Sequence, residues 1–487
     1  MVMQHERVSS PYLEGNFGPV REEVTAEDLK VIGELPEGLE GMFVRNGPNP
    51  QFDPIKGYHW FGGDGMLHGV RIKDGNVSYR NRYVQTERWR RENEAGRALW
   101  PSTLGGPPDP DNPAGPNPAN QGNTALVWHD GRLLALWEGG DPHHIALPGL
   151  ETCGRYNYGG SLVHAFTAHP KVDEKTGEMM FFGYNMLGMD MRTGQQVPFL
   201  QYSVASPQGE IVHTTPIELP VGVMMHDFAV TERYSIFMNL PLVFSMERAM
   251  KGENPLYFDR DRPSQFGLLP RRASGDRVRW FESPACYVFH VLNAFEEGDE
   301  VVLDGCRMNS VDLGALDSRT ALNPETKPLI DRDSEQTLYR WRFNLATGDV
   351  KEGRLDDATG DFPRVNDFEV GYKTRFGYVA RFDGSGMPQS DGVLKYDLEK
   401  ETSRFHHHGS RRYGGEAVFV PREGATAEDD GWLMTYVYDH NSGDSEFVVI
   451  NAQDVESEPV ARVPLPQRVP YGFHGAWIPE ERVTQSR

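Results

Sequence analysis

Short β-rich runs joined by tight polar turns recur along the whole chain. Many of the turns contain Asp-Gly, Thr-Gly or similar pairs, which suit hairpins because the central residues must tolerate positive φ. Apolar and polar residues alternate within the runs, as they do in strands with one buried face. Examples occupy residues 69–84, 125–138, 201–215, 340–355 and 393–405. Such hairpins predict an all-β protein, either a β-propeller or a large barrel.

Of these two architectures we favour the propeller, because its blades close radially and leave few exposed strand edges. No low-complexity linker divides the chain, so residues 1–487 are expected to form one domain. Two segments are predicted to be helical, Gln85–Leu99 and Leu242–Lys251. The stretch Gly105–Gly122, rich in Pro, Gly and Asn, is predicted to be a loop.

Composition narrows the classes of function. The net charge is −22, with 71 acidic residues against 49 basic ones, so the surface repels phosphate backbones and nucleic acid is not expected as a partner. The three cysteines form no CxxC pair, which favours a reducing cytoplasm over a disulfide framework. No signal peptide is visible, and no apolar run approaches the roughly 18 residues of a membrane span. A cytoplasmic location is therefore expected.

Four of the 16 histidines stand at the edge of β-rich or aromatic runs: His169, His226, His290 and His474. They are far apart in sequence, and the inner strands of a propeller would bring such residues to one axis. Imidazole binds zinc, copper, iron and nickel. The chain lacks HExxH, and no H-x-D or H-x-E pair supplies a facial triad. From spacing alone the ordinary alternative stays open, that these are separate core or surface histidines.

Ten segments carry a resemblance to a known family. In chain order they are FVRNGPNP (Phe43–Pro50), HWFGGDGMLHG (His59–Gly69), RLLALWEGGDPH (Arg132–His143), TAHPKVD, HDFAVT, FHVLNAFEEGD, DFPRV (Asp361–Val365), GGEAVFVPR (Gly414–Arg422), EDDGWLM (Glu428–Met434) and HGAW. With these segments the chain resembles the carotenoid cleavage oxygenases. The resemblance implies a seven-bladed β-propeller capped by a helical dome, with Fe(II) on its axis.

The resemblance also assigns residues. It implies that His169, His226, His290 and His474 bind the iron. It further implies that Glu138, Asp361 and Glu416 accept N–H bonds from three of the imidazoles, which keeps each ligating nitrogen unprotonated. Asp361 stands where the family usually has Glu, and its shorter side chain puts a direct contact in doubt. Thr124 matches a position beside the open sites of the iron, where it would influence O2 or water.

The expected reaction is the cleavage by O2 of a double bond in a carotenoid or apocarotenoid, with a small apolar alkene and O2 as partners. The substrate tunnel is expected to be aromatic, with Trp60, Phe61 and Trp137 as candidates. The stretch Pro241–Met250 is expected to make peripheral contact with a membrane. The run His406–His408 is interpreted as a solvated or loop cluster. The sequence does not address the oligomeric state.

Two alternatives remain at this point. The first is cleavage of a stilbene or phenylpropene. Trp137 occupies a position that is Lys in the stilbene-cleaving branch, and no Tyr occurs between Arg97 and Pro110, so both phenol-handling groups are absent. The stretch from His226 through His290, however, for example residues 245–272, resembles the phenylpropene-cleaving branch. The second alternative is a catalytically silent propeller that only binds ligands.

Overall fold

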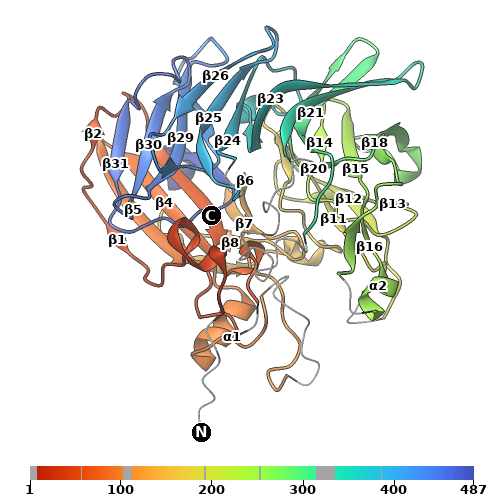
Figure 1. Ribbon diagram of the computed structural model, residues 1–487, viewed down its shortest axis with the longest axis horizontal. Coiled ribbons are helices and arrows are strands. Elements are labelled where there is room, and N and C mark those ends of the chain that lie inside the picture. Colours follow the sequence, from red (N-terminus) through yellow and green to blue (C-terminus); the bar gives the residue numbers. More distant parts are fainter. Residues whose placement is uncertain are drawn as a thin grey trace.

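Strands dominate the computed structural model, which describes residues 8–55, 57–102, 112–190, 194–251, 254–313, 335–384 and 387–487. Figure 1 shows the chain running round the molecule, from the orange sheet at the left through green at the right to blue at the upper left. The first and last sheets are neighbours as a result. The predicted all-β class is confirmed.

The described strands form seven antiparallel units and one small hairpin. One seven-stranded sheet counts as two units, because β23 pairs with β22 through residues 350–359 and with β24 through residues 360–364. The predicted seven-bladed propeller is therefore confirmed. The second unit consists of β6 (Ala125–His129), β7 (Arg132–Leu136), β8 (His143–Ile145) and β9 (Thr152–Arg155). The third consists of β10 (Lys171–Asp173), β11 (Glu178–Tyr184), β12 (Leu200–Ala205) and β13 (Ile211–Ile217). The fourth consists of β14 (Ala229–Val230), β15 (Tyr234–Asn239), β18 (Ser264–Pro270) and β19 (Arg279–Ser283).

Three further units follow in the chain. The fifth unit consists of β20 (Tyr287–Glu297), β21 (Glu300–Met308), β22 (Thr337–Asn344) and the first part of β23 (Val350–Arg364). The sixth consists of the end of β23 with β24 (Phe376–Phe382), β25 (Ser390–Asp397) and β26 (Thr402–His407). The seventh consists of β27 (Arg412–Tyr413), β28 (Val418–Pro421), β29 (Gly431–Asp439), β30 (Ser445–Asn451) and β31 (Ala461–Pro464).

The two ends of the chain close the ring. The C-terminal strand β32 (Gly475–Pro479) pairs with β3 in the first unit, and β2 (Ile32–Gly33) from the N-terminal region pairs with β31 in the last. Aromatic rings fill the seam: Phe43 lies 5.1 Å from Tyr436 and 5.6 Å from Phe447 between ring centroids. The first unit consists of β1 (Thr25–Ala26), β3 (Gly41–Pro48), β4 (Gly65–Lys73), β5 (Asn76–Tyr83) and β32.

The predicted hairpins are confirmed, because each of the five ranges contains two paired strands. Asp74 and Gly75 turn between β4 and β5 with φ of 51° and 75°. Asp130 and Gly131 do the same between β6 and β7 with φ of 47° and 71°. The Asp-Gly pairs therefore adopt the left-handed conformations for which they were singled out.

The helices are short. The predicted segment Gln85–Leu99 contains α1 (Glu87–Ala95), which Thr86 caps through its side chain and which ends at Gly96 with φ of 65°. The prediction for Leu242–Lys251 is wrong in its first half: residues 242–244 form β16 (Leu242–Phe244), paired with β17 (Leu256–Phe258), and Ser245 then caps α2 (Met246–Met250). The third described α-helix is α3 (Glu480–Thr484). Residues 112–122 of the predicted loop have no helix or strand, and its first part lies outside the described residues.

One buried carboxylate gives a stability prediction with a definite sign. Asp64, 5% exposed, lies between the 3₁₀ turn Trp60–Gly62 and β4, and its Oδ2 accepts a bond from the Gln51 N–H at 3.0 Å. Burial raises the pKa of Asp64 from 3.8 to about 6. A raised folded-state pKa means that stability is lost as the pH rises towards and through that value, by at most about 3 kcal/mol.

The Asp64→Asn variant is therefore expected to be more stable than the parent near pH 8 and little changed near pH 4. Urea unfolding midpoints at the two pH values measure this difference. An equal effect at both would show that the charge of Asp64 is not what burial penalises.

Candidate metal centre

Four histidines come together from four different units. His169 precedes β10, His226 precedes β14, His290 lies within β20 and His474 directly precedes β32. Each of these strands is the end strand of its sheet. The four side chains are all buried or nearly so, and we call them the four-histidine centre.

The imidazoles face one another through their Nε2 atoms. Nε2 of His226 lies 3.0 Å from Nε2 of His169 and 3.2 Å from that of His290. These three histidines can present nitrogens that are all within 4.8 Å of one another. The ring of His474 completes the group, 4.6 Å from the ring of His169 and 4.8 Å from that of His290 between centroids. Metal–imidazole bonds of about 2.0–2.1 Å at right angles place neighbouring nitrogens about 3 Å apart, so the spacing suits a shared cation.

Glu138 braces His226. The Nδ1–H of His226 donates to Glu138 Oε2 at 2.7 Å, and the Tyr184 hydroxyl donates to Glu138 Oε1 at 2.9 Å. Burial and the neighbouring carboxylate raise the pKa of Tyr184 well above its ordinary value, so it remains a phenol that can donate. Because a carboxylate only accepts, Nδ1 of His226 must carry the proton and Nε2 is left free.

Asp361 braces His290 directly. Nδ1–H of His290 donates to Asp361 Oδ2 at 2.9 Å, so the shorter side chain does reach its imidazole without a bridging water. Both residues lie at irregular places in their strands: register shifts occur in β20 between Val288 and Val291, and in β23 between Asp361 and Arg364. Such bulges redirect side chains beside active sites. Burial opposes a charged His290, but Asp361 outweighs it and the pKa of His290 is raised.

Glu416 braces His474 with both of its oxygens occupied. Oε1 accepts from His474 Nδ1–H at 2.9 Å, while Oε2 accepts from the Gly475 N–H at 2.7 Å and from Arg364 at 3.2 Å. Burial opposes the charged carboxylate, but Arg364, His474 and the N–H bond outweigh it and lower the pKa of Glu416 to about 2. Burial lowers the pKa of His474 against the opposing effect of Glu416, which favours a neutral imidazole.

His169 is the exception among the four. The contacts of the described residues include no carboxylate on its Nδ1, and its backbone N–H donates to Thr167 Oγ1 at 3.0 Å. Burial, together with the other three imidazoles, lowers the pKa of His169 well below its ordinary value. The ring is therefore neutral and has a lone pair to offer.

Each of the seven units thus contributes to one centre. Four supply a histidine, and three supply a carboxylate: Glu138 follows β7, Asp361 lies in β23 and Glu416 precedes β28. Thr124, just before β6, contacts the centre through its backbone, because its carbonyl accepts from the His474 N–H at 3.3 Å. The Thr124 hydroxyl donates to Asn123 Oδ1 at 3.0 Å, and its expected influence on O2 stays a prediction.

Sequence reasoning missed a buried ion pair behind the centre. Lys171 lies 2.7 Å from Asp227 Oδ1, and Asp227 Oδ2 accepts from the Val291 N–H at 2.9 Å. The pair links the strands that present His169, His226 and His290. The signal was available, because Lys171 and Asp227 follow their histidines closely in TAHPKVD and HDFAVT.

The interpretation of His406–His408 as a solvated or loop cluster is wrong. His406 and His407 belong to β26, and His406 and His408 are 4% and 9% exposed while His407 is exposed. Alternate residues of a strand point to opposite faces, so two of the three rings enter the interior.

The aromatic candidates differ in their positions. Trp60 is buried in a cluster with Tyr471 and Phe473, whereas Phe61 is half-buried and lies 5.8 Å from Phe473 between ring centroids. Phe289, which was not predicted, is half-buried with its ring centroid 5.3 Å from that of His226. Trp137 is half-buried next to Glu138.

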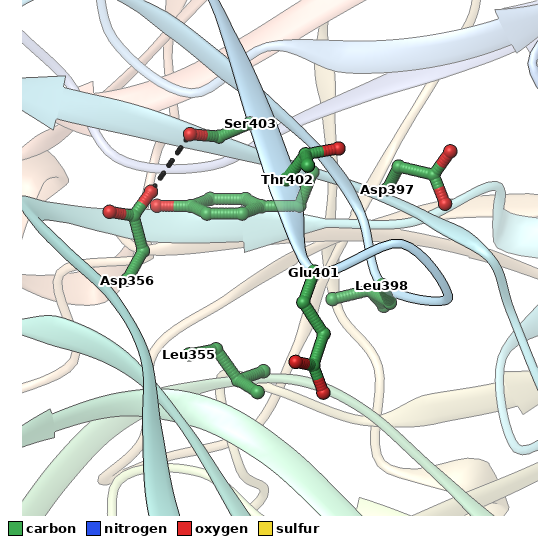
Figure 2. A pocket seen from close by; sticks show the side chains of 8 residues that line it. Leu355, Asp356, Asp397, Leu398, Glu401, Thr402 and Ser403 are labelled. Atoms are coloured by element: carbon green, nitrogen blue, oxygen red, sulfur yellow. Dashed lines mark hydrogen bonds between the residues drawn. The ribbon is translucent and has the colours of Figure 1, made fainter.

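A small surface pocket lies elsewhere. It is lined by residues of β23, the end of β25, the turn that follows and the start of β26. The Ser403 hydroxyl donates to Asp356 Oδ2 at 3.0 Å, a bond that is drawn in Figure 2. None of the four histidines or their carboxylates lines it, so it is not a candidate for the active site.

Comparisons with known proteins identify the family. The family profile described as "Retinal pigment epithelial membrane protein" matches residues 17–479. Carotenoid 9,10(9',10')-cleavage dioxygenase 1 of Arabidopsis thaliana is 42% identical, with 97% of this chain and 91% of that protein covered. The chain belongs to the carotenoid cleavage oxygenase family. The resemblance seen in the ten segments and the expected class of enzyme, an alkene-cleaving dioxygenase, are confirmed.

Two solved structures share the fold of this family member. Lignostilbene dioxygenase of Pseudomonas brassicacearum superposes with a TM-score of 0.87 at 30% identity, covering 97% of this chain and 99% of that one. A cobalt-substituted apocarotenoid oxygenase of Synechocystis has a TM-score of 0.81 at 27% identity, covering 95% and 97%. Both are named as oxygenases, which favours an enzyme over the alternative of a silent propeller.

Proposed function

We propose that this chain uses Fe(II), held by His169, His226, His290 and His474, to cleave a double bond of a carotenoid or apocarotenoid with O2. The observation that supports this proposal best is the convergence of four imidazoles in the interior, three of which are oriented by carboxylates. Neutral imidazole is a good ligand for iron, and four of them leave coordination positions for other molecules. When bound, the iron supplies the redox chemistry of O2.

The protein's own groups prepare the site. Glu138, Asp361 and Glu416 each hold a proton on Nδ1 of one imidazole, which keeps Nε2 free and fixes the plane of the ring. The buried surroundings exclude water and competing reactions. The reaction balances as one alkene and one O2 giving two carbonyl compounds.

Half-buried aromatic rings beside the centre suit an apolar polyene. We place Phe289 and Phe61 in contact with the substrate, because both are only half-buried. The Phe289 ring lies 5.3 Å from that of His226, and the Phe61 ring lies 5.8 Å from that of Phe473, the residue before His474. Apolar pockets with few polar groups are the usual environment for such a ligand. Trp137, in the position before Glu138, provides no cation to bind a phenolate.

The identities of the relatives favour the polyene over the aryl alkene. The plant enzyme named for carotenoid 9,10(9',10')-cleavage is 42% identical, and this relative carries the preference. The two solved structures, a lignostilbene dioxygenase and an apocarotenoid oxygenase, are 30% and 27% identical and do not separate the substrate classes. Products of 9,10 cleavage are the first to look for.

A competition assay tests the substrate class. Iron-loaded protein under ¹⁸O₂ receives β-carotene, a long apocarotenal, a hydroxystilbene and isoeugenol together, and mass spectrometry identifies the labelled carbonyl products. Labelled apocarotenoid products are expected, and their lengths locate the bond. Labelled aryl aldehydes instead would reverse the assignment in favour of the phenolic alkenes.

A lipid-soluble substrate would be reached by peripheral contact with a membrane. None of the described helices has the length and apolar character to cross a bilayer. The short helix α2 exposes Met246 and Met250, at 50% and 78%. Exposed apolar side chains on a short element can insert at a lipid surface. The negative net charge makes zwitterionic lipid the better partner.

Flotation with phosphatidylcholine vesicles tests this contact. The double variant Met246→Ser, Met250→Ser is expected to reduce the floated fraction severalfold. Val212→Ser is the matched control, because Val212 is 46% exposed on β13, in another unit. If the parent protein does not float, or the control behaves like the double variant, α2 is not a membrane contact.

A further inference from the structure

The three carboxylates of the centre differ in the length of their side chains. Glu138 and Glu416 contact their imidazoles at 2.7 and 2.9 Å with a side chain one methylene longer than that of Asp361. Asp361 nevertheless makes the same contact at 2.9 Å. Its neighbour Phe362 has φ of 55°, a left-handed backbone that a residue with a large side chain rarely adopts. Something must hold this part of β23 in place.

Gln336 contacts this irregular segment at two points. Its backbone carbonyl accepts from the Gly360 N–H at 2.9 Å, and its side-chain Nε2 donates to Asp361 Oδ2 at 3.0 Å. The same oxygen accepts the proton of His290 Nδ1, so the amide and the imidazole share one acceptor. Gln336 is 8% exposed, and a bond from an N–H to a carboxylate is strong in such surroundings.

The other oxygen of the Asp361 carboxyl group, Oδ1, is buried and accepts no hydrogen bond from the described residues. Burial, and then the nearby Asp361 carboxylate, raise the pKa of the Cys306 thiol well above its ordinary value. The Phe362 ring is stacked on His290, with centroids 5.2 Å apart and planes inclined by 28°. Asp361 is itself 4% exposed. A longer carboxylate would have to displace the Gln336 amide or push the imidazole away.

We propose that Gln336 is a positioning residue, and that Gln336 and Asp361 form a matched pair that orients His290 as one glutamate does for His226 and for His474. This inference rests on the proposed function of His290 as a metal ligand. A purely structural role would be different: Gln336 would anchor the start of β22 and the end of β23, and its loss would lower stability without changing how the centre binds a metal.

The pair predicts a specific pattern of metal affinity. Gln336→Ala removes a hydrogen bond that holds Asp361, and Asp361→Glu places a longer side chain against the Gln336 amide. Each single variant is therefore expected to bind Co(II) roughly tenfold more weakly than the parent. This loss is at the lower end of the roughly 10–100-fold range for groups that orient a metal ligand. In the double variant the longer carboxylate occupies the space that the amide leaves. Its affinity is expected within about threefold of the parent, a non-additivity of the kind found for residues in contact.

The experiment titrates metal-free, full-length protein with Co(II) and follows the visible absorption of the bound ion, which also reports its geometry. Thermal unfolding of the metal-free forms separates stability from binding. Gln265→Ala is the matched control, because the Gln265 amide also donates to a carboxylate, Glu282 at 3.0 Å, in a unit that supplies another histidine. It is expected to leave Co(II) affinity unchanged.

The two single losses with recovery in the double variant would establish the pair. Unchanged Co(II) affinity and spectrum in Gln336→Ala, or losses that simply multiply in the double variant, would overturn it. If the parent protein itself does not bind Co(II), the proposed function fails and this inference fails with it, which is distinguishable from a parent that binds while the variants show no coupling.

Discussion

A His226→Ala variant is expected to lose stoichiometric metal and, with it, cleavage of the alkene. His226 is central to the geometry, because its Nε2 lies within about 3 Å of the nitrogens of two other histidines, at 3.0 and 3.2 Å. Loss of groups that merely orient a ligand costs about 10–100-fold in affinity, so loss of the ligand is expected to cost at least 100-fold. Metal analysis of the purified protein and product formation should fall together.

The comparison needs a histidine outside the centre. His407 is exposed on β26, so His407→Ala is expected to retain metal and activity. Metal-free His226→Ala should still unfold cooperatively, at a somewhat lower temperature than the metal-free parent, because the bond to Glu138 and the packing of the ring are lost. A His226→Ala protein that keeps full metal content and activity would remove this residue from the ligand set.

The strand pattern of the fold could be predicted because its signals are local. Asp74–Gly75 and Asp130–Gly131 mark hairpins through a backbone preference that a few residues carry alone. Closure of the ring has no such signal: β3 and β32 pair across almost the whole chain, through contacts such as Arg45 with Gly475. The number of blades therefore came only with the family resemblance.

Local preference also explains the two errors. Residues 242–251 have a helical composition, but the first of them form a strand because Leu242 pairs with Phe258. Pairing with a neighbouring strand outweighs helix propensity at these positions. The His406–His408 run is polar in composition, and its alternate burial follows from period two once β26 is packed. Neither outcome is visible without the neighbouring strand.

Only the histidines of the centre and the carboxylates that contact them could be predicted from the sequence. Each histidine stood in a motif, and the carboxylates followed from the resemblance. Behind them, Lys171 and Asp227 have a local signal beside their histidines, but Arg364 and Tyr184 have none, because their partners lie far away in the sequence. Arg364 contacts Glu416 across 52 residues, and Tyr184 contacts Glu138 across 46. A polar residue becomes recognisable as an anchor only when the fold brings its carboxylate to it.

Glu416→Ala is expected to weaken both metal binding and stability. The substitution removes the acceptor of the His474 Nδ1–H, and it leaves Arg364 with one partner fewer beside the proposed site for a cation. Both effects oppose metal binding, so a loss of roughly 10–100-fold is expected. Breaking a buried ion pair lowers the free energy of unfolding by about 3–5 kcal/mol. The expected loss of stability in Glu416→Ala is smaller than this, because Arg364 still has an ion pair with Asp367 at 2.8 Å.

Asp304→Ala is the matched control for Glu416→Ala. Asp304 is 1% exposed and holds Arg340 through two bonds of 2.7 Å, so its loss also leaves a partly buried arginine without its carboxylate. Chemical unfolding should show that both variants are destabilised, whereas metal titration should show weaker binding in Glu416→Ala alone. Equal metal affinity in the two would mean that Glu416 stabilises the fold without orienting His474.

Glu416→Gln separates the charge of this residue from its shape. Glutamine has one acceptor oxygen, whereas Glu416 uses Oε1 for His474 and Oε2 for the Gly475 N–H and Arg364. One of these sets of donors must then face an amide NH₂. Because the pKa of Glu416 is lowered to about 2, the carboxylate is charged at every working pH, and metal affinity in this variant is expected to fall nearly as far as in Glu416→Ala. Retained affinity would show that one neutral acceptor is enough to hold the His474 proton.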